Sequence, residues 1–126
     1  MRNLETGRRG EQAALMYLEK EDYRILATNY RAKIGEIDII AKCPKKEYLV
    51  FIEVKTRSAN KPLSYGAPAE AVTFEKQRKI IKAALSYISH KKLNAANISC
   101  RFDILEIFIK NNEMTYNHIV NAFGEN

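Results

Sequence analysis

The chain has 126 residues, of which 46% are hydrophobic and 29% charged, so we expect a single globular domain over residues 1–126. Lys and Arg number 21 against 15 Asp and Glu, and the net charge of +6 favours a polyanionic partner, nucleic acid ahead of an anionic membrane. The chain carries no apolar run of membrane-spanning length and no secretory signal near its start, so we expect a cytoplasmic protein without membrane association.

A first helix is predicted to open in Gly7-Arg8-Arg9-Gly10-Glu11 and to run to about Lys20, with Thr6 as its N-cap. One stripe of this helix carries Glu11 together with Ala14, Leu15 and Leu18. Glu11 therefore either points from the core-facing stripe toward a site or simply favours the helix dipole from the first turn. The sequence leaves these two readings equal.

A strand is predicted over Tyr23–Arg31, followed by a hairpin whose strands are residues 35–41 and 51–57. If the hairpin folds between Lys45 and Lys46, the numbers of paired residues add up to 91. Asp38 then lies opposite Glu53, and Glu36 lies opposite Lys55. Period-two geometry places these four side chains on one face. The other face is expected to carry Ile37, Ile39, Val50, Ile52 and Val54.

Two carboxylates opposed across a hairpin repel each other, and the apolar residues on both faces predict that this strand pair is covered on both sides. A desolvated carboxylate pair is costly unless a metal or another partner compensates it. Asp38 and Glu53 therefore indicate a site for Mg²⁺ or Mn²⁺, which prefer oxygen ligands, with Lys55 as a positive charge beside it. The plainer alternative is that these side chains only form surface ion pairs.

Ser58–Pro68 is predicted to be a loop that follows the site directly, and a second helix is predicted over Thr73–Lys92. The expected apolar stripe of this helix comprises Gln77, Ile81, Ala84, Leu85 and Ile88. An amide on such a stripe suggests that Gln77 meets a polar group inside, such as the site.

Basic side chains are the candidates for contacts with nucleic-acid phosphates, and a solvated helix face is their alternative role. The candidates are Arg8, Arg9, Arg57, Lys76, Lys79 and Lys82. Two further strands are predicted, over Ile98–Ile109 and Met114–Phe123. The order of helix, three strands, helix and one or two strands indicates an α/β protein with a mixed sheet flanked by helices.

The same residues resemble a known family. Four blocks resemble the bacterial YraN family, also called UPF0102: residues 7–11, residues 35–38, residues 51–57 and Lys76-Gln77-Arg78. The run at residues 118–123 is similar to that family too. The family in turn resembles the restriction-endonuclease-like PD-(D/E)XK nucleases, above all the archaeal Holliday-junction resolvases. This resemblance implies an αβββαβ core with the site on the central hairpin.

Under this resemblance, Asp38 and Glu53 would be metal ligands and Lys55 the catalytic lysine. Glu11 would match the acidic residue of the first helix in the resolvases, as a third ligand, and Gln77 a polar residue of the second helix. The position of the motif's proline is Ile37 here.

The expected function is that of a Mg²⁺- or Mn²⁺-dependent endonuclease. Its expected substrate is DNA instead of RNA, in particular branched DNA in repair or recombination. A homodimer would allow symmetric cutting of two strands. Two alternatives stay open. The first is a catalytically inactive nucleic-acid-binding module that acts with partners, and the second is an interaction protein whose carboxylates form ion pairs only.

Overall fold

The computed structural model describes residues 4–58, 72–94 and 97–124, and the predicted order of elements is confirmed. The elements are α1 (Leu4–Lys20), β1 (Arg24–Arg31), β2 (Glu36–Lys42), β3 (Tyr48–Ser58), α2 (Phe74–His90), β4 (Ser99–Lys110) and β5 (Glu113–Phe123). Each end of β1, β4 and β5 lies within one residue of its predicted bound. The predicted loop up to Pro68 lies outside the described residues, apart from Ser58. No described helix is both long and apolar enough to cross a membrane.

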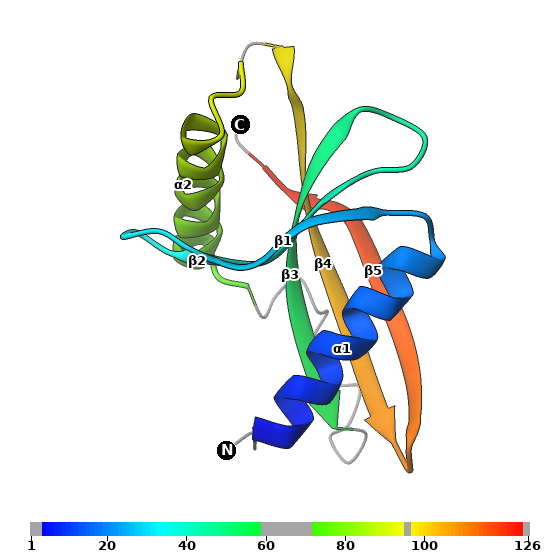
Figure 1. Ribbon diagram of the computed structural model, residues 1–126. Coiled ribbons are helices and arrows are strands. Elements are labelled where there is room, and N and C mark those ends of the chain that lie inside the picture. Colours follow the sequence, from blue (N-terminus) through cyan, green and yellow to red (C-terminus); the bar gives the residue numbers. More distant parts are fainter. Residues whose placement is uncertain (1–3, 59–71, 95–96, 125–126) are drawn as a thin grey trace.

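The strands form one mixed sheet in the order β1-β2-β3-β4-β5 (Figure 1). Only β3 and β4 run parallel; the other neighbouring pairs are antiparallel. A parallel pair needs a crossover connection, and the segment containing α2 provides it between β3 and β4. This confirms the α/β fold with an αβββαβ core and makes β3 the central strand.

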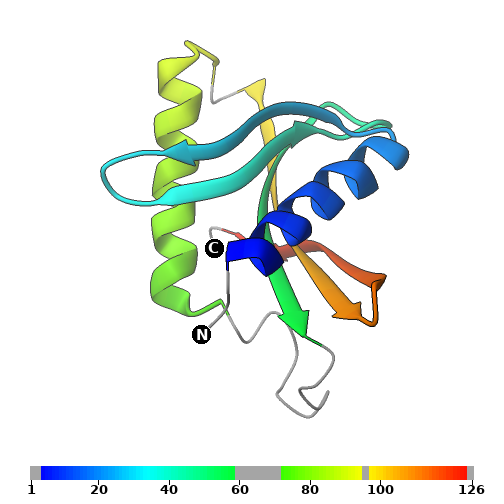
Figure 2. The same ribbon diagram turned by 60° about the horizontal axis from the view of Figure 1, so that its bottom comes forward.

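The two helices cover different faces of the sheet. Figure 1 shows α1 crossing in front of β3, and Figure 2 shows α2 on the far side of β1 and β2. Ala14 and Leu18 of α1 pack in one core with Ile52 of β3. Ile80 of α2 belongs to the other core, with Phe51 of β3. Because side chains alternate along a strand, β3 contributes side chains to both cores. Glu53 lies on the same face as Phe51, which is the face that α2 covers.

The predicted stripe of α2 is confirmed at Ala84 and Ile88 but wrong at Leu85, and Ile81 is only partly buried. The buried residues of α2 are Ile80, Ala83, Ala84, Tyr87 and Ile88. Leu85 is 50% exposed instead, because the aromatic ring of Tyr87 turns toward the sheet and packs edge-on against Phe51 and Tyr30. Lys76 lies four residues before Ile80, at the edge of this face, and its side chain is 46% exposed.

The hairpin register is confirmed where β2 and β3 pair, from Ile39 opposite Ile52 to Lys42 opposite Leu49. Before Ile39 in β2, and after Ile52 in β3, the two strands separate. This part of β2 stays paired with β1 alone. Ile37 therefore leaves the face predicted for it and joins the core under α2.

The start of α1 also differs from the prediction. The helix begins at Leu4, so Thr6 lies inside it and is not its N-cap. Two buried glycines, Gly7 and Gly10, follow within the helix. A Cβ on Gly10 would collide with the side chain of Thr56 in β3. The lack of a side chain at Gly10 is what lets α1 lie close to the end of β3 that follows Glu53 and Lys55.

We predict that Gly10→Ala lowers the free energy of unfolding by about 1–3 kcal/mol, because overpacking forces α1 away from β3. Urea denaturation measures this change. The double variant Gly10→Ala, Thr56→Ala should recover part of the loss, since it removes the atoms that clash. A matched Gly124→Ala variant, with nothing within 4 Å of its added Cβ, serves as the control. An undiminished stability of Gly10→Ala would contradict this account of the helix contact.

Candidate active site

A pocket of about 550 Å³ opens where β2 and β3 separate beneath the first turns of α2. Residues from β2, β3 and α2 line it, and they include Glu36, Asp38, Glu53, Lys55, Lys76 and Lys79. Its size is within the range of small-ligand sites. The structure therefore brings together all four side chains that the sequence placed on one face of the hairpin, and it adds two lysines from α2.

Asp38 lies at the point where the strand pairing stops. The main-chain N–H of Val54 donates a hydrogen bond to Asp38 Oδ2 at 2.8 Å, so a carboxylate takes the place of a backbone acceptor of β2. Burial, followed by the negative charge of Glu53, raises the pKa of Asp38 from 3.8 to about 7. The two carboxyl groups therefore interact, although the strand pairing stops at Ile39 and Ile52, so the predicted pairing of Asp38 opposite Glu53 is not formed.

Glu53 is 6% exposed, and the ammonium groups of two lysines lie close to its carboxylate. Lys76 Nζ lies 2.6 Å from Glu53 Oε2, and Lys55 Nζ lies 3.6 Å from the same oxygen. Burial and the positive charge of Lys76 together lower the pKa of Lys55. Burial also acts to lower the pKa of Lys76, but the hydrogen bond and charge of Glu53 outweigh it and raise that pKa. Two adjacent lysines thus have oppositely shifted pKa values.

These residues fit a divalent cation through the chemistry of their donor set. Mg²⁺ is usually held by one or two carboxylates and retains several waters or substrate oxygens. Asp38 and Glu53 supply two such carboxylates beside an open pocket. Burial and the negative charge of Glu53 raise the pKa of Asp38, and a cation at this point would favour the ionised carboxylate. Among the described residues, no group of three or more His, Cys, Asp or Glu side chains is arranged to hold a metal ion, so the protein offers two carboxylates.

Glu11 and Gln77, the other two predicted site residues, do not join this lining. Glu11 is exposed on α1. Gln77 is half-buried, and its Nε2 donates to the carbonyl of Val72 at 3.0 Å. The amide does meet a polar group, as expected, but that group is the backbone just before α2. Lys76 is the residue of the second helix that reaches the carboxylates.

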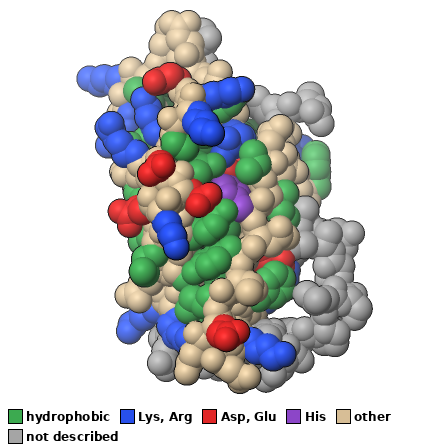
Figure 3. Space-filling view, turned by 90° about the vertical axis from the view of Figure 1, so that its right-hand side faces the viewer, with side chains coloured by type: hydrophobic (Ala, Val, Ile, Leu, Met, Phe, Trp, Pro, Cys, Tyr) green, Lys and Arg blue, Asp and Glu red, His purple; other side chains and the backbone are tan. Residues whose placement is uncertain are grey.

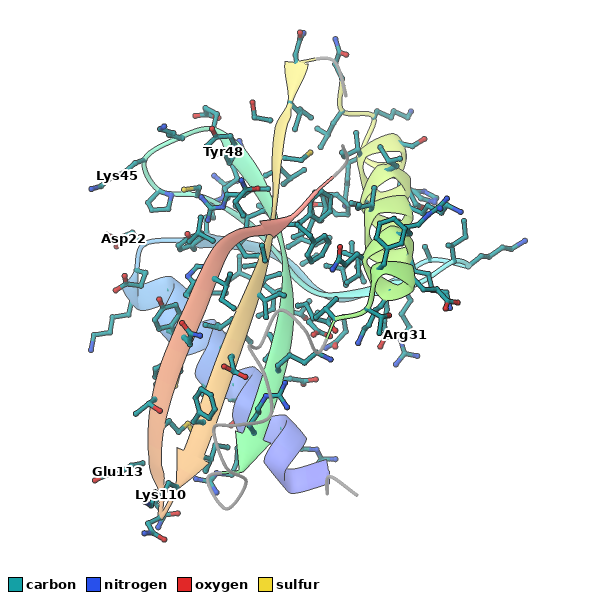
Figure 4. The ribbon with its side chains drawn as sticks, turned by 180° about the vertical axis from the view of Figure 1, so that it is seen from behind. Asp22, Arg31, Lys45, Tyr48, Lys110 and Glu113 are labelled. Carbon is teal, nitrogen blue, oxygen red and sulfur yellow. The ribbon has the colours of Figure 1, made fainter. Side chains whose placement is uncertain are left out.

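The six predicted phosphate-binding residues lie on three elements, which are α2, α1 and β3. Lys76 and Lys79 line the pocket, and Lys79 also lies 3.7 Å from Glu75 one turn earlier. Lys82 is exposed further along α2, whereas Arg8 and Arg9 lie on α1. Figure 4 shows labelled Arg31, at the end of β1, beside the lower end of α2, whereas labelled Lys45, in the turn between β2 and β3, lies on the far side of the view. The described basic residues close to the carboxylates therefore come chiefly from the first turns of α2.

Arg57, on β3, lies beside Glu106, a buried residue that the sequence analysis missed. Arg57 Nε lies 2.6 Å from Glu106 Oε2, and the side chain of Glu106 is 2% exposed. Glu106 is in register with Lys55 across the parallel strands. The second carboxylate oxygen, Oε1, is buried without a hydrogen-bond partner. The sequence offered one signal for Glu106, which is its place in a strand of otherwise largely apolar residues.

A second polar cluster, also missed, connects β4 to β5. Arg101 Nε and Nη2 donate to the two oxygens of fully buried Asp103 at 2.9 and 2.8 Å. His118 Nε2 lies 2.7 Å from the same carboxylate, and the backbone N–H of Asn121 donates to it. These hydrogen bonds hold the pKa of Asp103 below its usual range despite burial. The cluster satisfies its own charges and joins strands.

The fold and the pocket define this protein as an α/β domain with paired carboxylates and lysines at the splayed end of its central hairpin. Residues 10–107 match the model of the "Uncharacterised protein family UPF0102". A UPF0102 protein of Clostridium beijerinckii is 45% identical over 126 residues, covering 98% of this chain and 97% of that protein. One of Clostridioides difficile is 46% identical over 123 residues, covering 98% and 100%. The chain belongs to the UPF0102 family, which confirms the resemblance seen in its sequence.

We predict that Asp38→Asn stabilises the metal-free protein at pH 8 by about 1–2 kcal/mol, because an amide can accept the Val54 hydrogen bond without repelling Glu53. With a pKa near 7, Asp38 is protonated in the folded state and ionised in the unfolded chain between about pH 4 and 7. The stability due to this proton is fully present below pH 4 and is lost as the pH rises through 7.

Urea denaturation of both proteins in EDTA, at pH 5 and pH 8, measures this difference. The gain from Asp38→Asn should be larger at pH 8 than at pH 5. Asp22→Asn, which changes an exposed carboxylate, is the control and should show no such dependence. Equal stabilities of the Asp38→Asn variant and the parent at pH 8 would show that the carboxylates do not repel each other.

We also predict that Arg57→Ala costs about 3 kcal/mol of stability, because it leaves the buried Glu106 carboxylate unpaired. The double variant Arg57→Ala, Glu106→Gln should recover part of this loss. Arg31→Ala breaks the exposed pair with Glu36 and should cost less than about 1 kcal/mol. Urea denaturation of the three variants tests the prediction, and equal losses for Arg31→Ala and Arg57→Ala would contradict it.

Proposed function

We propose that this protein is a metal-dependent endonuclease that hydrolyses DNA phosphodiester bonds in the pocket between β2, β3 and α2. The observation that carries the proposal is the meeting of Asp38 and Glu53, from separate strands, in an open pocket that also holds Lys55 and Lys76. Carboxylates for a cation and lysines for a phosphate are the groups that phosphodiester hydrolysis requires.

Asp38 and Glu53 would hold a cation such as Mg²⁺ or Mn²⁺. When bound, the cation supplies polarisation of the phosphate and lowers the pKa of water at the site. Val54 keeps the Asp38 carboxylate in place through its main-chain N–H. Lys55, with its lowered pKa and partly buried side chain, orients the attacking water or stabilises charge that develops on the phosphate. Lys76 and Lys79 border the same pocket, where they can contact the neighbouring phosphates.

The distribution of surface charge supports a DNA path along α2. The face in Figure 3 has a band of hydrophobic side chains through its middle, with Lys and Arg gathered mainly toward its top and bottom. That face presents no continuous basic stripe. Lys76, Lys79 and Lys82, in contrast, follow one another at three-residue spacing along the exposed side of α2. A phosphate backbone that enters the pocket can therefore continue along this helix.

The proposed substrate is branched DNA in repair or recombination, and the support for this choice is the similarity of the sequence motifs to those of junction resolvases. Symmetric cutting of a junction needs two sites, so the proposal includes a homodimer. Glu11, exposed on α1, is included only as a ligand that would have to approach when the metal or the DNA binds.

One observation favours a second candidate, a nucleic-acid-binding module without turnover. In the described structure Lys76 already pairs with Glu53 at 2.6 Å, so Glu53 has a positive partner without a metal. Such a protein would bind DNA through its lysines and leave the strands intact.

The test is cleavage of labelled branched, duplex and single-stranded DNA with Mg²⁺ or Mn²⁺, compared with EDTA. We expect metal-dependent cutting, best on branched DNA, that Glu53→Gln abolishes. Lys55→Ala should lower the rate about 10²–10³-fold while leaving DNA affinity within a few-fold, because its charge acts mainly in the transition state. Lys110→Ala, at the exposed β4–β5 turn labelled in Figure 4, is the matched lysine control.

Each contrary result has its own meaning. Intact DNA binding without cutting on any substrate would favour the binding module. Cutting that survives Glu53→Gln would place the active site elsewhere. Equal losses of rate and DNA affinity in Lys55→Ala would remove the catalytic role of that lysine.

A further inference from the structure

The shortest ion pair in the pocket belongs to Lys76, to which the proposed function gives a phosphate contact but no part at the carboxylates. Lys76 Nζ lies 2.6 Å from Glu53 Oε2, whereas Lys55, the expected catalytic lysine, lies 3.6 Å from that oxygen. The Glu53 side chain is 7% exposed and that of Lys76 is 46% exposed. Lys76 therefore reaches from a half-open position to a buried carboxylate.

The position of Lys76 on α2 explains this reach. It lies in the first turn, on the stripe that continues through buried Ile80 and Tyr87. Thr73 caps this turn by accepting a hydrogen bond from the backbone N–H of Lys76 at 3.1 Å, which fixes where the side chain starts. The cap and the packing of Ile80 set the backbone. The Lys76 side chain is 46% exposed, so its ammonium has room to turn away once it leaves Glu53.

An ammonium in this position interferes with a divalent cation. A carboxylate oxygen that binds Mg²⁺ lies about 2.0–2.1 Å from the metal. If Lys76 kept its 2.6 Å contact and the cation bound the same oxygen, the two positive charges would lie within about 5 Å of each other. The ammonium also uses a lone pair of Glu53 Oε2 that the cation would need. Simultaneous binding of the Lys76 ammonium and a divalent cation to Glu53 is therefore unfavourable.

We propose that Lys76 competes with the divalent cation for Glu53 in the free protein and, once displaced, binds a phosphate of the DNA. This inference rests on the proposed function, because it assumes a cation on Asp38 and Glu53. Lys76 compensates the buried carboxylates when no cation is present, which limits the cost of desolvating two like charges. After displacement its ammonium turns into the open part of the pocket, next to Lys79.

The proposal predicts two effects of opposite sign. Removal of the Lys76 charge should tighten the binding of Mg²⁺, because a competitor is gone, and weaken the binding of DNA, because a phosphate contact is lost. A lysine that only supports the structure would produce neither effect, and a lysine that only binds DNA would produce the second alone.

The experiment measures Mg²⁺ binding to the full chain by isothermal titration calorimetry without DNA, at pH 8.5. Lys76→Gln should bind Mg²⁺ about tenfold more tightly than the parent, which corresponds to about 1.4 kcal/mol. Lys76→Arg, which keeps the charge, should remain near the parent value. DNA affinity, measured by fluorescence anisotropy with Ca²⁺ replacing Mg²⁺, should fall in Lys76→Gln, and the salt dependence of log K should decrease by about one unit.

Lys79→Gln is the matched control, because Lys79 lines the same pocket but pairs with exposed Glu75 instead of Glu53. It should weaken DNA binding and leave the Mg²⁺ affinity unchanged. A cooperative thermal unfolding transition of each variant, measured in EDTA, would confirm that the variant is folded.

The outcomes separate this inference from the proposed function. If Mg²⁺ binds the parent, is lost in Glu53→Gln and is not tightened by Lys76→Gln, the competition is overturned while the metal site stands. If neither the parent nor Lys76→Gln binds Mg²⁺, both proposals fall. Tighter Mg²⁺ binding with unchanged DNA affinity would overturn the second role of Lys76.

Discussion

The hydrogen bond from the Val54 N–H to the Asp38 carboxylate is the contact on which the candidate site depends. It lies where β2 stops pairing with β3 and turns away with β1. A continuous ladder would leave two carboxylates side by side beneath α2, without an opening to solvent. The early separation of the strands opens the pocket, and the same hydrogen bond keeps Asp38 beside Glu53. The geometry of the site and the end of the ladder are therefore one structural feature.

The pocket conflicts with the stability of the domain that surrounds it. Two acidic groups share a partly desolvated space, and the pKa of Asp38 rises to about 7 as a result. Lysines from β3 and α2 offset the negative charge only in part. Local conflicts of this kind are expected at functional sites, where stability is lower than an apolar arrangement would give. A bound cation would remove the conflict, which is why we interpret the pocket as a binding site.

The cluster around Asp103 shows how the same domain treats a carboxylate with no such role. Asp103 is fully buried, but Arg101, His118 and a backbone N–H satisfy it, and its pKa is lowered. Each cluster combines carboxylates with basic side chains. Only the pocket leaves its carboxyl group with a raised pKa beside open space, and this difference separates a structural network from a candidate reactive site.

The sequence by itself determined the strand register and the face of the hairpin that carries Glu53, because hairpin pairing and side-chain alternation are local and have a fixed period. It could not determine which residue of α2 would meet the carboxylates. The apolar residues around α2 allow more than one rotation, and sequence reasoning chose the stripe of Gln77. Packing of Tyr87 on Phe51 decided the rotation and brought Lys76 to the site. Long-range contacts likewise decided the separation of β2 from β3 and the burial of Glu106, because neither follows from the spacing of residues along the chain.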